Sequence, residues 1–515
     1  MSNAQSVLRS LIIYAICVPL AIVLGYKLTN PLDVTTYLVV GIVLFIIIVP
    51  LLLNFHHILL ILSWNTCVVI FFLPGHPHLW LLAVVISLVV AIGHRTLNPN
   101  MHFIHVPQLT WPLLALVVVV VVTAKLTGGV GLKVMGDETY GGRRYFYLLG
   151  AIFGYFALTT RRISHEHAGL LVALFFLGGL TNMIGDFYAF TPQPLTYFYL
   201  LFPPNASLTV ADAAGFSGVR LMGLTAAAFA VYCFMLSKYG IRGILTAGKP
   251  WRLIAFFLIT GVSFSGGYRS TVLAIGLIFW VQFYLEGLHR TKLLPMILFA
   301  MVAVGTCSLP FLTKLPFVVQ RAIAFLPVQI DEQVRANAET SSDWRVAIWK
   351  AVLPQIPQHL LLGKGYGLAR ENYEFAQSTS FRAISEDQGI TAEAGDYHNG
   401  PLSVVLTFGI WGVVAFLWFS VAGGRVLYNN YRYGDPALRN VNALLLAAYV
   451  QQMVMFLFVV GGLSSDMLKF TGWLGLSVSL NGGLARRPAP VPVPTAQKAR
   501  VFPGVPPRPR PVFER

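Results

Sequence analysis

Long apolar runs recur along the whole chain, and they restrict its fold more than any other feature. About fourteen of them suffice to cross a hydrocarbon core of about 30 Å, which takes roughly 20 helical residues, or fewer where a helix is short or distorted. Because helices satisfy their own backbone hydrogen bonds in lipid, the pattern predicts an all-α, polytopic bundle of about 12–14 transmembrane helices. The runs are Leu11–Leu28, Val34–Leu53, Ile58–Leu73, Leu79–Gly93, Leu109–Ala124, Tyr145–Thr160, Gly169–Gly185, Val219–Ser237, Leu253–Ser265, Thr271–Leu285, Leu293–Leu309, Leu402–Ala422, Val441–Val460 and Leu468–Leu484.

Composition supports the same class. Only 11% of the 515 residues are charged and 56% are hydrophobic, whereas a soluble domain carries about 25% charged residues. So few charges cannot cover a water-facing surface of this size, so we exclude a cytosolic enzyme, a DNA-binding protein and a disordered scaffold. The net charge of +16 is explained by membrane topology and not by a nucleic-acid partner, because the basic residues lie in short loops.

These basic loops predict the orientation of the chain. By the positive-inside rule they face the cytoplasm, and the helix alternation then places both termini there. Residues 1–30 are expected to be a retained helix, since another apolar run follows at once. One loop conflicts: the segment after Ala124, placed outside, is basic too, so either the alternation slips there or its basic residues have another role. The cytoplasmic set is Arg161, Arg162, Lys238, Arg242, Lys249, Arg252, Arg290, Lys292, Arg425, Arg432 and Arg439, and the conflicting set is Lys125, Lys133, Arg143 and Arg144.

The chain is expected to divide into three parts. Residues 1–214 form N-terminal transmembrane helices, and residues 215–484 form a second membrane region that includes a periplasmic loop at 310–400. Residues 485–515 are rich in Pro and Arg, which favours an extended, disordered cytoplasmic tail over an adaptor-binding site. All four cysteines lie in apolar runs, where they are expected to pack and not to form disulfides or a metal site.

The loop at 310–400 is where chemistry is expected. It holds about half of all the acidic residues and eight Lys or Arg. An amphipathic helix is predicted to open after Ser341-Ser342-Asp343 and to end at Pro354 and Pro357. The glycine-rich turn Gly363–Gly367 would allow backbone to approach a ligand closely. By the same alternation the loop is expected to face the periplasm or the exterior, where there is no ATP, so a reaction there needs an already activated substrate.

Four side chains near this loop are candidates for that chemistry. Arg269 lies between two short apolar runs with no acid beside it in the sequence, so an anionic ligand explains it better than snorkelling to the interface. Arg345 either decorates a loop helix or binds a ligand, and Arg220 is either a phosphate contact or an interface anchor. His398 precedes a long apolar helix and can take a proton near neutral pH. Arginines that clamp a diphosphate beside a histidine that activates a hydroxyl describe glycosyl transfer from a lipid diphosphate.

The ordered motifs resemble those of the O-antigen ligase and O-antigen polymerase family over roughly residues 215–480. They are Arg220-Leu-Met-Gly223, Ser265-Gly-Gly-Tyr-Arg-Ser270, Asp343-Trp-Arg345 with Trp349, Gly363–Gly367, and His398-Asn399 leading into Leu406-Thr-Phe-Gly409-Ile-Trp-Gly412. Two departures stand out. Thr225 and three alanines follow Gly223, where an Asn/Pro-containing step is common in the family. Ser265 is also spaced from Arg269 where the family commonly sets the pair adjacent, which suggests a bulge.

The resemblance implies an inverting glycosyltransferase of the bacterial inner membrane that acts at the periplasmic face and needs neither nucleotide nor metal. Its donor would be a glycan on undecaprenyl diphosphate. Its acceptor would be lipid A core in a ligase or a second lipid-linked glycan in a polymerase. Arg269 and Arg345 would bind the diphosphate, with Arg220 as a further contact, and His398 would act as base or orienting group.

Other classes remain open at this level. A lipid-linked sugar transporter or flippase fits the helix count, although Asp186, Glu286 and Asp466 lie at run ends and not inside the membrane as proton-coupled carriers usually require. A metal-dependent hydrolase could be argued from His76 with His78, from His165 with His167, or from His94, His102 and His105, but no carboxylates converge with them in the sequence. The sequence does not distinguish a ligase from a polymerase, and it does not identify the donor or acceptor sugars.

Overall fold

The computed structural model describes residues 52–73, 75–100, 102–131, 139–204, 220–246, 248–369 and 397–487, with scattered residues between 11 and 50. Most of the predicted runs Leu11–Leu28 and Val34–Leu53 lies outside these residues, as does the predicted tail beyond Arg487.

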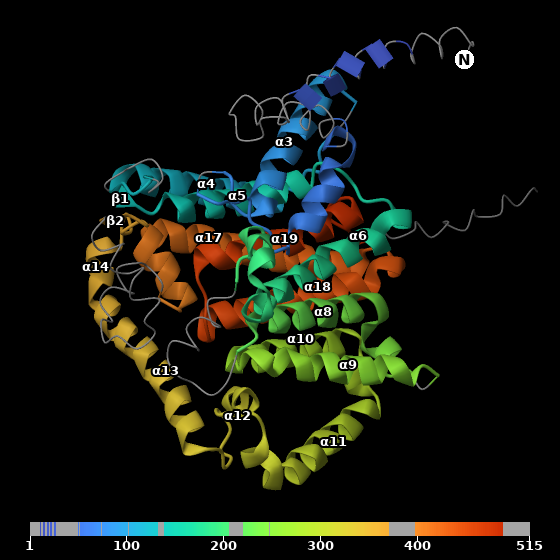
Figure 1. The fold of residues 1–515 in the computed structure, drawn as a ribbon, viewed down its shortest axis with the longest axis vertical. Coiled ribbons are helices and arrows are strands. Elements are labelled where there is room, and N and C mark those ends of the chain that lie inside the picture. The colour runs from blue at the N-terminus through green and yellow to red at the C-terminus, as the bar shows by residue number, and fades with distance from the viewer. Residues whose placement is uncertain are drawn as a thin grey trace, which may run out of the picture.

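The described chain is a bundle of α-helices (Figure 1), which confirms the predicted fold class. The strands among these residues, β1 (Thr139–Tyr140) and β2 (Leu368–Ala369), form one short antiparallel pair. The helices are Leu52–Ser63, α3 (Leu79–Leu97), α4 (Pro107–Thr127), α5 (Gly142–Leu158), α6 (His165–Leu177), α8 (Met222–Ile244), α9 (Pro250–Val262), α10 (Arg269–Leu285), α11 (Leu293–Ser308), α12 (Phe317–Ile323), α13 (Glu332–Val352), α14 (Ile356–His359), α17 (Gly400–Tyr433), α18 (Arg439–Phe458) and α19 (Leu463–Asn481).

Seven helical segments of the described chain are long and apolar enough to cross a membrane. Every predicted run from Ile58 onward contains a helix, so the chain is a multi-pass membrane protein. One boundary was wrong: the helix in Ile58–Leu73 ends at Ser63. Beyond it the chain turns back, so that Val69 donates its N–H to Leu201 and pairs with His78, and these non-local partners take the place of further helix.

The core joins the two ends of the sequence. α5 packs along α19, and α4 packs along α17. The fully buried indole of Trp64 shows how close these contacts are, because a Cβ on Gly472 of α19 would lie 2.1 Å from its Nε1. The same nitrogen donates a hydrogen bond to the carbonyl of Leu468 at 3.2 Å. The division into 1–214 and 215–484 stays a prediction, and one apolar core runs through both parts.

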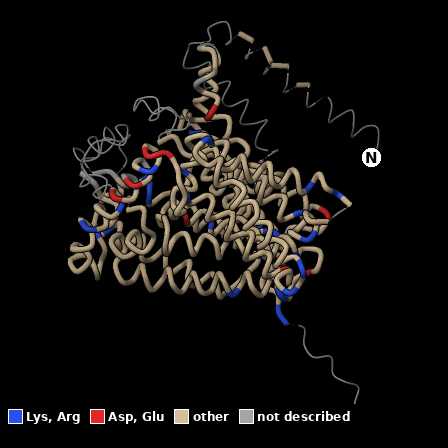
Figure 2. Tube along the Cα trace, turned by 90° about the horizontal axis from the view of Figure 1, so that it is seen from below, with Lys and Arg blue, Asp and Glu red and all other residues tan. Residues whose placement is uncertain are grey.

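The two ends of the bundle differ in the loops that they carry. Ile163, which follows α5, donates its N–H to Ser479 at 2.9 Å, and Tyr431 of α17 donates to the carbonyl of Leu285 at the end of α10. These contacts gather the predicted cytoplasmic loops at one end, while most of the bundle between the ends lacks charged residues (Figure 2). The loops therefore lie relative to one another as the alternation predicts, and which end faces the cytoplasm stays a prediction.

The conflicting basic loop lies at the other end, and its arginines do have another role. β1 lies within this loop and pairs with β2. The Arg144 guanidinium stacks on the ring of Tyr366, 5.6 Å from its centroid, and Arg143 lies over Tyr147 at 5.3 Å. These cation–π contacts occupy both arginines in tertiary packing.

Three acidic residues at the ends of the apolar runs cap backbone. The Asp186 carboxylate accepts the N–H groups of Gly223 and Leu224 at 3.1 and 2.6 Å, where α8 begins. Glu286 accepts those of Ile241 and Arg242, directly after the break in α8 at Gly240. Asp466 accepts the N–H of Gly462 and contacts Lys469 at 3.0 Å. Each carboxylate thus satisfies helix donors that would otherwise lack a partner.

A break in α17 at Gly409 shapes the end of the bundle that carries the conflicting loop. Gly409 has φ 63° and ψ −160°, and the carbonyls of Leu406 and Thr407 accept instead the N–H groups of Lys364 and Gly365 at 2.6 and 3.0 Å. A Cβ on Gly363 would lie 2.2 Å from the Thr407 oxygen. The Gly363–Gly367 turn was predicted to allow a close approach of backbone to a ligand. The backbone that it approaches closely is that of α17.

Candidate functional site

The turn before α10 sets Arg269 in place. The short 3-10 helix η4 (Ser263–Gly266) ends α9, and Gly267 reverses the chain with φ 63° before α10 begins at Arg269. The Thr225 hydroxyl accepts the N–H of Gly266 at 2.7 Å, which ties the turn to α8. The spacing between Ser265 and Arg269 is thus a helix break that puts Arg269 at the first position of a helix. Thr225, a departure from the family pattern, holds this turn.

α13 supplies the opposite wall, and its start was predicted wrongly. The helix begins at Glu332 and not after Asp343, because the Asp331 side chain caps it by accepting the N–H of Gln333 at 2.8 Å. Its end at Val352 agrees with the prediction. In its middle, Arg269 reaches across, and its Nη2 donates to the Ala338 carbonyl at 3.1 Å and to the Ser342 hydroxyl at 3.0 Å.

The apolar half of α13 fixes the helix against α17. Ile348 and Val352 are fully buried against Leu402 and Leu406, and the Trp349 indole donates to the Tyr397 carbonyl at 2.9 Å. Ala351, next to Val352, is exposed. α13 therefore contacts both the start of α10 and the start of α17, so it relates Arg269 to the segment that holds His398.

His398 lies directly before α17. Its backbone has φ 47°, an uncommon conformation for a residue other than glycine. Asn399 caps α17, since its side chain accepts the N–H of Leu402 at 3.0 Å. The Trp344 ring packs edge-on against the imidazole at 5.1 Å. His398 thus precedes a long apolar helix, as predicted.

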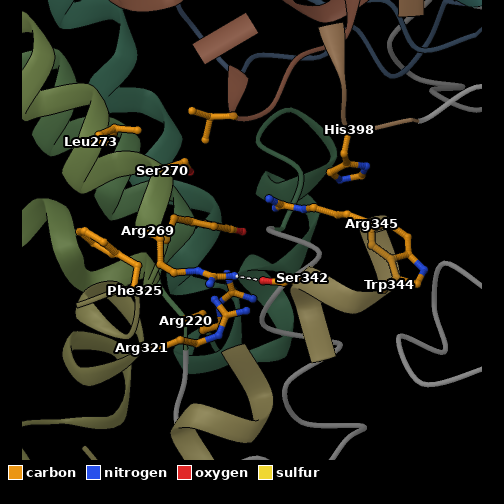
Figure 3. Close-up of a pocket in the computed structure, with 12 residues that line it drawn as sticks. Arg220, Arg269, Ser270, Leu273, Arg321, Phe325, Ser342, Trp344, Arg345 and His398 are labelled. Atoms are coloured by element: carbon orange, nitrogen blue, oxygen red, sulfur yellow. Dashed lines mark hydrogen bonds between the residues drawn. The ribbon is translucent and has the colours of Figure 1, made fainter. Parts of the chain in front are cut away.

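These residues surround one cavity of about 480 Å³ (Figure 3). All four predicted site residues, Arg220, Arg269, Arg345 and His398, line it. None of the described lining residues carries a carboxylate. The remaining lining is Tyr268, Ser270, Leu273, Arg321, Phe325, Ser342, Trp344 and Val459.

The arginines come from three directions. Arg220 precedes α8, where its Nε donates to the Gly266 carbonyl at 3.0 Å and its guanidinium lies 4.3 Å from the centre of the Tyr268 ring. In Figure 3 it lies near Arg269 and Ser342, whereas Arg345 extends from α13 toward His398. Several positive charges in one partly buried cavity favour a polyanionic ligand such as a diphosphate.

Sequence reasoning missed one member of this group, Arg321 on α12. Its Nη1 donates to the Gly267 carbonyl at 2.9 Å. Burial, together with the positive charges of Arg220, Arg269 and Arg345, lowers its pKa to about 10. Its sequence neighbours give no sign of this, because α12 reaches the cavity only by folding back onto the turn before α10.

The candidate metal ligands do not assemble. Within the described ranges no three His, Cys, Asp or Glu side chains lie close enough together to hold a metal ion. Among the candidate histidines, the His78 ring packs edge-on to the Tyr147 ring, with the centroids 5.7 Å apart. The backbone N–H of His78 also donates to the Tyr147 hydroxyl. His165 approaches Asp435 at 3.6 Å.

Comparison with known proteins identifies part of the chain. Residues 253–417 match the family model described as O-Antigen ligase, a stretch that contains α10, α13 and the start of α17. No curated protein matches the chain. The match covers about a third of the chain, and over this stretch the chain is similar to the O-antigen ligase family.

Proposed function

We propose that this chain transfers a glycan from undecaprenyl diphosphate to a sugar hydroxyl, with inversion at the anomeric carbon. The observation that carries the proposal is that Arg220, Arg269, Arg345 and His398, distant in sequence, line one cavity. The cavity lies at the end of a membrane bundle, where a lipid-anchored substrate can present its headgroup. A diphosphate is the part of such a donor that several arginines suit best.

The reaction needs a base and a stabilised leaving group. The acceptor oxygen forms a bond to the anomeric carbon while the bond from that carbon to the phosphate oxygen breaks. His398 takes the hydroxyl proton, and the electron pair of the broken bond stays on the departing undecaprenyl diphosphate. Arg269 and Arg345 bind the diphosphate and balance the negative charge of the leaving group, and Arg220 is a further contact.

The arginines also explain how the reaction proceeds without nucleotide or metal. The donor is already activated as a glycosyl diphosphate, so its own bond supplies the free energy. Four guanidinium groups around the cavity provide the positive charge that a divalent cation supplies in many phosphate-handling sites. In this proposal the chain resides in the bacterial inner membrane, with both termini cytoplasmic and the cavity facing the periplasm.

A transporter of lipid-linked sugar is the competing function. Ion-coupled carriers place acidic residues where they can exchange protons or sodium within the membrane. Asp186, Glu286 and Asp466 instead accept backbone N–H groups, which is a structural task. This observation favours the transferase.

The test is transfer by the purified full chain in detergent, supplied with undecaprenyl-diphosphate glycan alone or together with lipid A core. Product that forms only with lipid A core makes the protein a ligase, and longer lipid-linked chains from donor alone make it a polymerase. His398→Ala, Arg269→Ala and Arg345→Ala are expected to abolish either product at normal abundance. If the donor stays intact while labelled lipid-linked glycan crosses a reconstituted bilayer, the protein is a transporter and not a transferase.

A further inference from the structure

Arg321 is built into the cavity by the same turn that positions Arg269. A Cβ on Gly267 would lie 3.2 Å from the carbonyl oxygen of Val318, so α12 packs directly on this turn. The hydrogen bond from Arg321 Nη1 to the Gly267 carbonyl then fixes the side chain. Because only one residue separates Gly267 from Arg269, a movement of the turn would shift both guanidinium groups together.

The surroundings of Arg321 favour an anion beside it. Like charges on Arg220, Arg269 and Arg345, added to burial, weaken its hold on its own proton, yet at neutral pH it stays charged. A guanidinium group binds phosphate oxygens through paired hydrogen bonds, and Arg321 lines the same cavity as the other three arginines. Arg321 is therefore placed for ligand binding as directly as Arg269 is.

The arginines divide into two groups by position. Arg220, Arg269 and Arg321 cluster on one side of the cavity, and Arg345 lies between them and His398 (Figure 3). The two phosphates of a glycosyl diphosphate also differ in their distance from the reacting carbon. The sugar-side phosphate is joined to that carbon through one oxygen, and the lipid-side phosphate follows through a further bridging oxygen. The phosphate nearer His398 must then be the sugar-side one.

We propose that Arg321 is a further diphosphate-binding residue, which forms with Arg220 and Arg269 a seat for the lipid-side phosphate while Arg345 binds the sugar-side phosphate. This inference rests on the proposed function and extends it by assigning each phosphate to its own arginines. The seat would also take the single phosphate of undecaprenyl monophosphate, since that lipid carries its phosphate at the same position.

The two groups should then differ in kinetics. The charge on the lipid-side phosphate stays the same through the reaction, so Arg321 stabilises donor and transition state equally, and its loss raises KM with little change in kcat. The sugar-side phosphate gains charge as the glycosidic bond breaks, so loss of Arg345 lowers kcat.

Binding of two lipids to the purified full chain tests the assignment without any transfer. The probes are undecaprenyl monophosphate and undecaprenyl diphosphate, titrated against wild type, Arg321→Gln, Arg321→Lys and Arg345→Gln. Arg335→Gln is the matched control, because Arg335 on α13 donates to the Val328 carbonyl and does not line the cavity. Thermal unfolding of each variant is measured alongside.

Arg321→Gln should weaken the binding of both lipids about tenfold, because it removes one hydrogen-bonded contact between a charged side chain and a phosphate. Arg321→Lys should weaken it less, because the charge remains and the planar fork is lost; it also serves as the test if Arg321→Gln unfolds. Arg345→Gln should weaken the diphosphate and leave the monophosphate unchanged.

Three results would overturn the inference. Wild-type affinity in both Arg321 variants would remove Arg321 from the seat. An equal loss of affinity for the two lipids in Arg345→Gln would refute the division of the arginines into two groups. Wild type that binds neither lipid would refute the proposed donor itself, which separates failure of the function from failure of this assignment.

Discussion

The indole ring of Trp344 meets the imidazole of His398 edge-on, with the ring centroids 5.1 Å apart and the planes at 78°. Trp344 precedes Arg345 on α13, so one helix supports the proposed base and supplies a proposed phosphate ligand. Trp344→Ala should lower kcat roughly tenfold, less than the loss of a base itself, because His398 remains but is no longer held in one orientation.

Steady-state transfer measures this effect. Trp344→Phe should restore most of the rate because it keeps an aromatic edge contact, and Trp411→Ala on the exposed face of α17 is the control. A Trp344→Ala enzyme with the wild-type kcat would show that the contact is packing alone.

Ser342 is expected to position Arg269 for the donor. The Ser342→Ala variant removes one of the two acceptors of Arg269 Nη2 and leaves the Ala338 carbonyl. We expect a KM for the donor raised about three- to tenfold with kcat nearly unchanged. A fall in kcat at constant KM would contradict this reading and place Ser342 in the chemical step.

A side chain at Gly409, where α17 breaks, is expected to destabilise the protein. In Gly409→Ala the new Cβ would lie 2.7 Å from the carbonyl oxygens of Leu360 and Leu361, at a φ of 63°. Strain of about 1–3 kcal/mol is expected, measured as a lower unfolding temperature in detergent. Gly305→Ala, whose Cβ would meet nothing within 4 Å, should unfold like wild type, and equal stability of the two variants would disprove the strain.

Asp186 is expected to stabilise the start of α8. Asp186→Ala leaves the N–H groups of Gly223 and Leu224 without their carboxylate acceptor, which costs about 1–2 kcal/mol of stability. Asp186→Asn keeps an oxygen acceptor and should lose less. Thermal unfolding checks both, and a proton-coupled carrier would instead show equal loss of function in the two variants with no loss of stability.

Chelation should leave transfer intact. Purified protein assayed in EDTA is expected to keep its full rate, since arginine charges and His398 perform the proposed steps. Loss of activity in EDTA that returns with a divalent cation would refute the metal-independent mechanism. Donor binding measured in the same buffer tells whether a lost metal had served binding or chemistry.

The helices could be predicted from the sequence because each apolar run carries its own signal. The start of α13 could not, since the helix was predicted from the cap-like run Ser341-Ser342-Asp343, whereas Asp331 caps it. The choice depends on burial: Val334 and Ala338 are only 2% and 3% exposed, through contacts with distant parts of the chain. The same holds after Ser63, where the apolar pattern continues but the partners of Val69 lie elsewhere.

The site was predicted where the residue was unusual in its sequence context and missed where it was ordinary. Arg269 stands out between two apolar runs, and His398 stands out before a long one. Arg321 lies in a mixed loop segment, and only the packing of α12 on Gly267 brings it to the cavity. The resemblance supplied Arg345, which sequence alone left undecided.

The break at Gly409 also limits how the chain can change in length. An α-helix turns by about 100° per residue, and the carbonyls of Leu406 and Thr407 are bound to the turn at Lys364 and Gly365. Insertion or deletion of a single residue between His398 and Leu406 would therefore rotate the imidazole away from Trp344 and out of the cavity. Beyond Gly409 an inserted residue would shift the remainder of α17 and leave His398 in place, so related chains should vary in length after the break and not before it.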